Sequence, residues 1–559
     1  MPSGIEGAPS RRGGAFAVGA GILASRLAGF ARAAVTSAAF GVGAHADVLQ
    51  TALRAPNLLQ NLLGEQALSA SFIPVYSRLL AAGRPEAARR FAGAVFGLLL
   101  AVVALLSLVG ILAARPLVAV FAVGYLQDAS RVAAGELAVD RFELAVQAVR
   151  WMFPMTGLLV LSAWALGVLN SHRRFFLSYV APVAWNAAIV AALAWGMLTW
   201  TETGEERATR LLLAVCVGAL VGGLAQLAVQ LPSVLRELGG LPVTFSTSVE
   251  GVRDALRAFA PAVAGRGVVQ LSSYLDQVLA SLLAVGAVSA LGYAQMLYLL
   301  PLALFGQSIA AAALPDLARD GARAGADELA GRARRALGSA GFLNLPVAVA
   351  YLTLGPVLAA ALYRLLPGRF GEADAWLVGL VLGAYALGLP ASTGSRVLQS
   401  TYFALGDTRT PARAAAARVA FGALVAVPAM LLLDRVALAA LPGPPGRLES
   451  GLRLGALGLA LGASAAAWLE WGWLSRALGR RVPGLRGAGP GSARVALASA
   501  AGALAAWAAL AAIGERPWPP LVRAVTAGAA FAGLFVALGL ALGLPQLERV
   551  RGALTGRRA

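Results

Sequence analysis

The sequence contains no lysine, one cysteine and two histidines among its 559 residues. Without lysine there can be no Walker A loop, which places a lysine on nucleotide phosphates, and no Schiff-base chemistry. The lone Cys216 excludes an internal disulfide, and the widely separated His45 and His172 fit no zinc motif. We therefore expect a protein that does not itself hydrolyse ATP and holds no metal cluster.

Charge is scarce as well. Only 13% of the residues are charged and 59% are hydrophobic, and the mean hydropathy is +0.74. Soluble globular proteins have about 25% charged residues, so this composition predicts an integral membrane protein. The net charge of +19 comes from arginines scattered between apolar runs, which the positive-inside bias explains better than nucleic-acid binding.

Apolar runs of about 20 or more residues recur along the whole chain, and none shows the alternation typical of a β-barrel. The sequence therefore predicts an all-α polytopic membrane protein with about fourteen transmembrane helices. The expected spans are 15–41, 47–78, 91–122, 145–170, 175–200, 208–232, 252–285, 288–318, 336–366, 375–403, 412–441, 453–475, 493–514 and 520–545.

The distribution of arginines predicts the orientation of the chain. They gather in the connections after spans 2, 4, 8, 10 and 12, whereas the opposite connections are acid-rich or balanced. The positive-inside bias then places the N-terminal segment 1–14 and the tail 547–559 in the cytoplasm. We find no cleavable signal in the N-terminal segment.

A weak internal repeat relates the first twelve spans. Arg89-Arg90 opens the third span and Arg334-Arg335 opens the ninth. An even number of spans per repeat gives both halves the same orientation, related by a pseudo-two-fold axis along the membrane normal. We expect an N-lobe at 15–236 and a C-lobe at 251–478 around a central cavity, as in alternating access, plus two further helices at 490–546.

The stretch from Ser25 to Arg78 places charges well inside two apolar spans, which a short turn near Gly41 to Asp47 joins. A guanidinium in hydrocarbon costs several kcal/mol unless it faces water, a partner or an anionic ligand. These charges therefore predict a water-filled cationic cavity between helices. They are Arg26, Arg32, Arg54 and Glu65.

The same stretch carries motifs of a known family. The first span reads S-R-L-A-G-F-A-R, the turn F-G-V-G-A-H-A-D, and the second span P-N-L-L followed by E-Q-A-L-S-A-S-F-I-P. Further likenesses lie at 169–175, 181–186, 276–281, 286–301 and 402–411. Together they resemble the MurJ (MviN) family of lipid II flippases, which has fourteen spans and belongs to the multidrug/oligosaccharidyl-lipid/polysaccharide exporter (MOP) superfamily.

The resemblance implies a transporter and not an enzyme. The family moves the undecaprenyl-pyrophosphate-linked peptidoglycan precursor, lipid II, from the cytoplasmic to the periplasmic leaflet. Its cavity arginines are thought to hold the pyrophosphate, and its last two helices to form a groove for the polyprenyl tail. Arginine forks do match phosphate oxygens bidentately. We expect a monomer in the bacterial inner membrane, in contact with membrane lipids and without nucleic acid or cofactor, driven by Na⁺, H⁺ or the membrane potential.

The resemblance and the buried charges together select the candidate site residues. The substrate-binding candidates are Arg26, Arg32, Asp47, Arg54, Glu65, Arg266 and Arg396, and Asp276 is a weaker candidate for a coupling cation.

Two departures from the family pattern affect this site. Gln60 and Asn61 stand where the family usually has basic residues, and Gln295-Met296 replaces an Asp-Arg or Asn-Arg pair. We expect Arg266 in the seventh span to compensate.

The charges of the first two spans also allow structural interpretations. Arg26 can form a buried pair with Glu65 or Asp47, and Arg32 and Arg54 lie near enough to the outer interface to snorkel. Glu65 can be a protonation site or a partner of Arg26.

The later charges allow the same alternatives. Asp276 can cap a helix end instead of binding a cation, and Arg396 can form a structural pair. We interpret Glu470 as an acid that snorkels to the interface.

Three rival functions remain. One is transport of another polyprenyl-linked oligosaccharide. Another is drug export, for which an acidic cavity and twelve spans are expected. The third is a membrane glycosyltransferase or polymerase, which needs a carboxylate base or metal near the outer surface. The acids predicted there are more simply a solvated loop, and they are Asp128, Glu136, Asp140 and Glu143.

Overall fold

The computed structural model describes residues 11–307, 326–441, 451–485, 493–514 and 518–554. These residues form helices joined by turns. No β-strand forms among the described residues, where Ala437 and Arg453 make an isolated β-bridge. The predicted all-helical fold is confirmed. The chain divides into two compact units, Met1–Leu282 (unit 1) and Leu283–Ala559 (unit 2).

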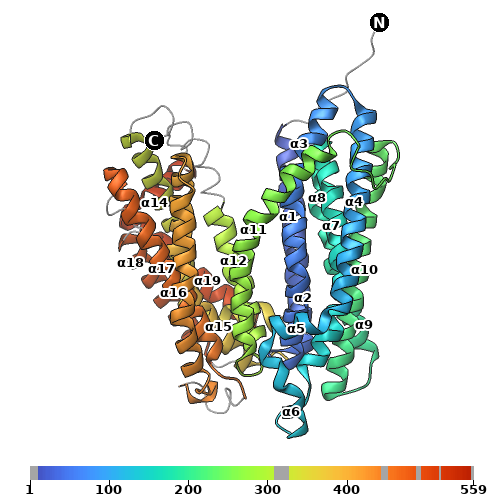
Figure 1. The fold of residues 1–559 in the computed structure, drawn as a ribbon. Helices are drawn as coiled ribbons and strands as arrows, with labels where there is room; N and C mark the ends of the chain where they lie inside the picture. Colours follow the sequence, from blue (N-terminus) through green and yellow to red (C-terminus); the bar gives the residue numbers. More distant parts are fainter. Residues whose placement is uncertain (1–10, 308–325, 442–450, 486–492, 515–517, 555–559) are drawn as a thin grey trace. The chain divides into compact units, whose positions relative to one another are not determined.

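Unit 1 is built around one buried helix, α7, which contacts α2, α3, α4 and α10. In the apolar part of α7, 89% of the residues are buried, and Trp164 is among its fully buried side chains. The elements of unit 1 are α1 (Arg11–Phe40), α2 (Ala44–Leu63), α3 (Glu65–Ala81), α4 (Pro85–Leu112), α5 (Ala114–Phe121), η1 (Val123–Gln127), α6 (Asp128–Ala133), α7 (Arg141–Ser171), α8 (Phe175–Val180), α9 (Pro182–Thr199), α10 (Gly204–Leu238) and α11 (Val252–Ser281) (Figure 1).

Unit 2 has its own central helix, α15, which packs against α12, α14 and α17. In its apolar part 83% of the residues are buried. The described elements are α12 (Ala287–Pro301), the π-helix η2 (Leu302–Gln307), α14 (Ala326–Tyr363), α15 (Glu372–Ala404), α16 (Arg409–Leu433), η3 (Leu438–Ala440), α17 (Gly455–Arg481), η4 (Pro483–Leu485), α18 (Ala493–Ile513), α19 (Pro520–Ala541) and α20 (Pro545–Leu554).

The two central helices fit the predicted repeat, because α7 is the fourth expected span and α15 is the tenth. Small residues allow the close packing: a Cβ at Gly388 of α15 would lie 2.7 Å from the Cα of Ser464 on α17. The lobe boundaries at 15–236 and 251–478 stay a prediction. In unit 1, α11 packs on α2 and α3.

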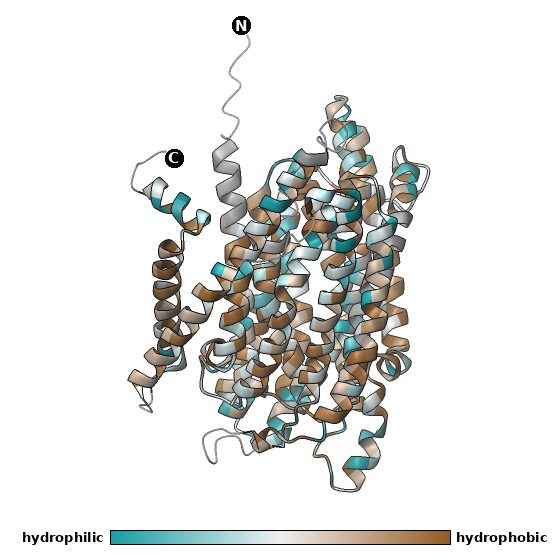
Figure 2. Ribbon diagram, turned by 90° about the vertical axis from the view of Figure 1, so that its left-hand side faces the viewer, coloured by the Kyte–Doolittle hydropathy of each residue, from teal (hydrophilic) through white to brown (hydrophobic). Residues whose placement is uncertain are grey.

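The helices are apolar enough to make this a multi-pass membrane protein. Figure 2 shows brown, apolar residues along the helices and teal, hydrophilic residues gathered more toward their ends. In the described part of the chain, ten segments are long and apolar enough to cross a membrane. They are 85–112, 141–171, 175–199, 204–238, 287–304, 328–363, 372–404, 409–433, 493–513 and 520–541.

The four other expected spans coincide with α1, α2–α3, α11 and α17. These helices carry most of the charges singled out in the sequence, which lowers their hydropathy. The total of fourteen spans stays a prediction.

The turn between the first two helices forms where the sequence predicts it. α1 ends at Phe40, and Gly41 takes a positive φ of 58° that favours glycine. The second expected span is, however, not one helix, because α2 ends at Leu63 and α3 begins at Glu65. The Gly64 N–H donates to the Gln60 carbonyl at 2.8 Å, and a Cβ at Gly64 would lie 2.3 Å from that oxygen. The break therefore depends on glycine.

Candidate functional site

Arg26 lies in the middle of α1 with an exposed side chain. Among the described residues, it makes no hydrogen bond and no ion pair. The alternative pairing with Glu65 or Asp47 is therefore not formed in this structure. A guanidinium without a partner among the described residues has all five of its N–H donors available for a ligand.

Arg32 lies six residues further along α1 and faces α9. Its Nε donates to Oδ1 of Asn186 at 2.8 Å, and its guanidinium lies 5.1 Å from the centre of the Trp185 ring. Asn186 is itself oriented, because its Nδ2 donates to the Pro182 carbonyl at 2.9 Å. Arg32 thus contributes to the packing of α1 against α9, whereas Arg26 does not.

Asp47 lies in the first turn of α2, within a fully buried ion cluster. Its Oδ2 is 3.5 Å from Nη1 of Arg141. The same arginine donates two hydrogen bonds to the Asp128 carboxylate, from Nε at 2.6 Å and from Nη2 at 3.1 Å. The Arg141 guanidinium stacks over Tyr125, 4.3 Å from the ring centre. We call these four residues the Arg141 cluster. They join α2 to η1, α6 and α7.

The interpretation of the acidic connection before α7 as solvated is wrong for Asp128. Its side chain is 0% exposed, because the bidentate contact with Arg141 draws it into the interior. Asp140 has a structural role too, since its Oδ1 accepts the backbone N–H groups of Phe142 and Glu143 at the start of α7. No spacing in the sequence identifies Arg141 as the partner of Asp128.

Arg54 lies half-buried on α2, where α11 packs against it. The Tyr274 hydroxyl of α11 donates to the main-chain oxygen of Arg54 at 3.2 Å. One turn away, Gln277 donates from Nε2 to the Thr51 hydroxyl at 2.8 Å. These buried polar contacts fix α2 against α11, and sequence reasoning did not find them because single tyrosines and glutamines carry no motif.

Glu65 is the first residue of α3 and is exposed. Within the described residues, Glu65 makes no ion pair or hydrogen bond. Its predicted roles as a proton or substrate site stay predictions.

Two further candidates lie on α11. The helix extends through Arg266, whose side chain is outside the described residues, so its predicted compensating role stays a prediction. Asp276 is half-buried near the end of the helix.

Arg396 lies on α15, close enough to Arg418, Glu470 and Tyr298 to interact electrostatically with them. Glu470 on α17 is only 2% exposed, and both of its oxygens are bound: Gln399 donates to Oε1 at 2.9 Å and Arg418 to Oε2 at 2.7 Å. We call Arg396, Gln399, Arg418 and Glu470 the Arg396 cluster.

The expectation that Glu470 snorkels to the interface is wrong. The hydrogen bonds from Gln399 and Arg418 satisfy the carboxylate inside the unit, so it does not need to reach water. Arg418, which sequence reasoning did not single out, is the residue that makes this burial possible.

The connection between α15 and α16 carries another ion pair. Asp407 accepts the backbone N–H of Thr410 at 2.9 Å and its hydroxyl at 2.7 Å, and Arg481 donates to the same carboxylate at 2.7 Å. These contacts hold the pKa of Asp407 well below its usual range. They fix the start of α16 next to the end of α17.

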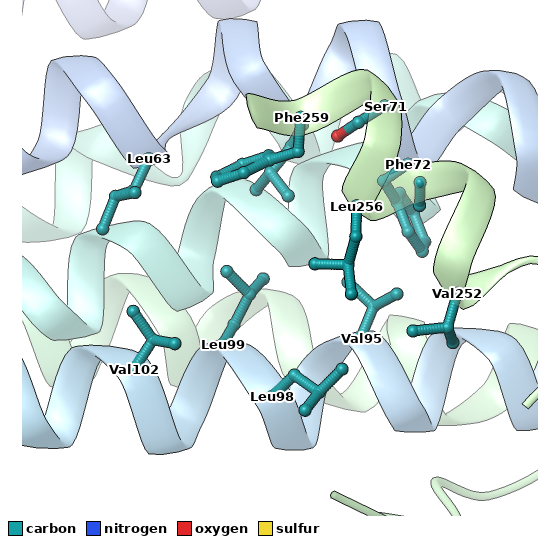
Figure 3. A pocket seen from close by; sticks show the side chains of 12 residues that line it. Leu63, Ser71, Phe72, Val95, Leu98, Leu99, Val102, Val252, Leu256 and Phe259 are labelled. Atoms are coloured by element: carbon teal, nitrogen blue, oxygen red, sulfur yellow. The ribbon is translucent and has the colours of Figure 1, made fainter. Parts of the chain in front are cut away.

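An apolar pocket opens in unit 1, with an empty volume of about 530 Å³ that includes its open mouth. Figure 3 shows that Phe72, Leu99 and Phe259, from α3, α4 and α11, line it, and that Ser71 supplies a lone hydroxyl. None of the predicted charged residues lines this pocket. Its lining is apolar apart from the Ser71 hydroxyl and carries no positive charge for a pyrophosphate.

A sequence model described as lipid II flippase MurJ matches residues 36–525 of the chain. This range contains the turn after α1, the break at Gly64 and both ion clusters. The chain belongs to the MurJ family.

Sequence relatives and solved structures agree with this membership. The probable lipid II flippase MurJ of Rhizobium tropici is 34% identical over 73% of this chain and 74% of its own length. A solved lipid II flippase MurJ in an inward closed conformation matches with a TM-score of 0.67 and 18% identity, over 94% of this chain and 99% of that one. An inward-facing MATE family transporter of the MOP superfamily matches with a TM-score of 0.58 and 15% identity, over 83% and 95%. The solved structures support the fold.

Three of the positions that depart from the MurJ pattern carry uncharged polar residues. The Gln60 carbonyl accepts the N–H of Gly64, and Gln295 donates from Nε2 to the Tyr385 hydroxyl at 2.9 Å. Asn61 is exposed next to the break. Of the three side chains, that of Gln295 is held within unit 2 by its hydrogen bond to Tyr385, and none of the three supplies a positive charge.

Proposed function

We propose that this protein is a lipid II flippase, which moves the undecaprenyl-pyrophosphate-linked precursor from the inner to the outer leaflet. Family membership supports the substrate, because the matched family and its relatives carry that name. The observation in this chain that supports it most directly is Arg26, a guanidinium inside a membrane-spanning helix that is exposed and has no partner among the described residues. Such a group suits a pyrophosphate.

The mechanism that we propose is alternating access by two six-helix lobes, 15–236 and 251–478, around a central cavity. The equivalent places of α7 and α15 in their units support this repeat. The helices within 490–546 would hold the polyprenyl tail, and the protein would work as a monomer without covalent chemistry. Both termini would lie in the cytoplasm, as the arginine distribution predicts.

We also propose that an ion gradient or the membrane potential drives the cycle. Asp276 is the candidate cation ligand, since a carboxylate on a membrane-spanning helix is a common place for a coupling ion. Transport measured with a Na⁺ gradient, a proton gradient or a potential alone separates these possibilities. An Asp276→Asn variant that keeps full gradient dependence would exclude Asp276.

Complementation tests the proposed function. A bacterium depleted of its own lipid II flippase is supplied with the wild-type protein or with Arg26→Ala. We expect the wild type to restore growth and Arg26→Ala to fail at equal membrane expression, because the pyrophosphate loses its bidentate partner.

The control is Arg90→Ala. Arg90 is exposed in the first turns of α4, outside the predicted cavity, so its loss should leave growth unchanged. Failure of the well-expressed wild type would redirect the search to other polyprenyl-linked sugars. Growth with Arg26→Ala would contradict the proposed role of Arg26.

A further inference from the structure

The charged residues of the Arg396 cluster come from three neighbouring helices at a similar depth. Arg396 lies about 12 Å along α15 from its end at Ala404, and Arg418 about 13 Å along α16 from its start at Arg409. Glu470 lies about 16 Å along α17 from its end at Arg481. α17 packs against both α15 and α16, so the three side chains meet well inside the membrane-spanning part of unit 2.

The charges of this cluster do not balance. Glu470 supplies one negative charge, and it is bound by Arg418 and Gln399 through its two oxygens. Arg396 makes no hydrogen bond or ion pair among the described residues, although it lies near enough to Arg418 to be repelled by it. Two guanidinium groups therefore lie beside one carboxylate that only Arg418 binds, which leaves one uncompensated positive charge.

An uncompensated guanidinium at this depth is destabilising. Because Arg396 is half-buried, water alone does not fully solvate its charge. Arg418 is 38% exposed, and one of its nitrogens binds Glu470. Its remaining N–H groups and all those of Arg396 are donors that an anion can use. Glu470 and Gln399 act as positioning residues that hold Arg418 beside Arg396.

We propose that Arg396 and Arg418 form a binding site for a phosphate-bearing anion within unit 2. The inference rests on the proposed function, where the anion is the pyrophosphate of the transported lipid. The same chemistry would accept the phosphate of an ordinary anionic phospholipid. Two adjacent guanidinium forks bind phosphate oxygens better than they bind a single carboxylate, because each fork takes two oxygens.

A polar and aromatic wall borders this site. On α15, Ser392 lies one turn before Arg396, and it accepts a hydrogen bond from the Tyr298 hydroxyl of α12 at 3.2 Å. The Tyr298 ring stacks on Tyr385 with 5.2 Å between the ring centres. Hydroxyl groups and ring faces next to the arginines suit a phosphate carrying a polar headgroup.

The test measures anion binding by the purified full-length protein in lipid nanodiscs. The probe is farnesyl pyrophosphate, a short polyprenyl pyrophosphate, with phosphatidylglycerol as competitor in one arm. We expect Arg396→Gln and Arg418→Gln each to weaken probe binding about tenfold or more, as for loss of charge-assisted hydrogen bonds. The matched control is Arg413→Gln, which changes an exposed arginine on the same helix as Arg418.

A melting experiment separates binding from a structural role. Without ligand, Arg396→Gln should keep or raise the melting temperature, since Arg396 has no partner to lose among the described residues. A lowered melting temperature with unchanged probe affinity would overturn the proposal. Equal weakening by Arg413→Gln would also overturn it, because the effect would then be a general loss of positive charge.

The competitor identifies the source of the phosphate. Retained probe binding in excess phosphatidylglycerol indicates a site for the polyprenyl pyrophosphate, whereas displacement indicates a phospholipid headgroup site. The outcome is independent of complementation. Normal probe binding by Arg396→Gln, combined with rescue by the wild type and failure of Arg26→Ala, would overturn this inference and leave the proposed function intact.

Discussion

Arg141 in unit 1 lies between two carboxylates, and the side chains of Arg141, Asp47 and Asp128 are at most 1% exposed. In unit 2, Arg418 binds Glu470 and remains 38% exposed, and Arg396 lies close to both without binding either. The first cluster has more negative than positive charge and is closed to water, whereas the second has more positive charge and is open. A buried cluster in which every charged group is bound marks a structural network, and a partly exposed excess of positive charge marks a place for an anion.

Of the changes considered, replacing Arg141 in the closed cluster should lower the stability of the protein most. Arg141→Gln leaves two buried carboxylates without their cation, so we expect the free energy of unfolding to fall by about 3–5 kcal/mol. Thermal melting of the purified protein measures this. The control is Arg131→Gln, whose exposed pair with Glu136 should contribute less than about 1 kcal/mol. A melting temperature equal to that of the wild type would show that the Arg141 cluster is not structural.

The acid of the open cluster should matter less for stability. Glu470→Gln keeps a partner for Gln399 but loses the charge-assisted bond to Arg418, and we expect a loss of about 1–3 kcal/mol. The control is Glu548→Gln on α20, an exposed glutamate. Introducing Arg396→Gln into Glu470→Gln should restore part of the stability, because it removes the repulsion between the two arginines. If it lowers stability further, the two arginines do not repel each other as the charge balance requires.

The smallest loss of stability is expected from replacing Asp407 in the connection between α15 and α16. Hydrogen bonds from Thr410 and the ion pair with Arg481 lower the pKa of Asp407. Its stabilising contribution is therefore full above the ordinary aspartate pKa of about 3.9 and is lost as the pH falls toward the folded-state pKa. We expect Asp407→Asn to lower the melting temperature by a constant amount between about pH 5 and 8, and by less below about pH 4.

Exposed Glu328 supplies the control for this prediction. Its i, i+4 pair with Arg332 lies at the surface, so Glu328→Gln should leave the melting temperature nearly unchanged at every pH. A difference between wild type and Asp407→Asn that grows as the pH falls would contradict the assigned direction of the pKa.

The helices could largely be predicted from the sequence, because apolar runs of membrane length have few alternative structures. The turn at Gly41 was also predictable, since its motif places glycine where the backbone needs a positive φ. The break at Gly64 was not, because the hydropathy on either side continues without a change. The family resemblance identified the function class through motifs and not through hydropathy.

The partners of the charged residues were less predictable. Arg26 could be selected from its depth alone, but the roles of Asp128 and Glu470 depend on residues that are 13 and 52 positions away, Arg141 and Arg418. Contacts between helices of different spans leave no local pattern in a single sequence. The charged residues could therefore be listed from the sequence, but the structure was needed to separate closed networks from open sites.

A transport assay with the purified protein in liposomes would decide whether Arg26 binds the transported pyrophosphate. Lipid II with a fluorescent headgroup is placed in both leaflets, and a membrane-impermeant reductant bleaches the outer pool. With the wild type, we expect bleaching to proceed to the inner pool, because the protein brings that pool to the outer leaflet. With Arg26→Ala it should stop near half, while Arg90→Ala behaves like the wild type. Complete bleaching with a folded Arg26→Ala protein would contradict the cationic site that we propose on α1.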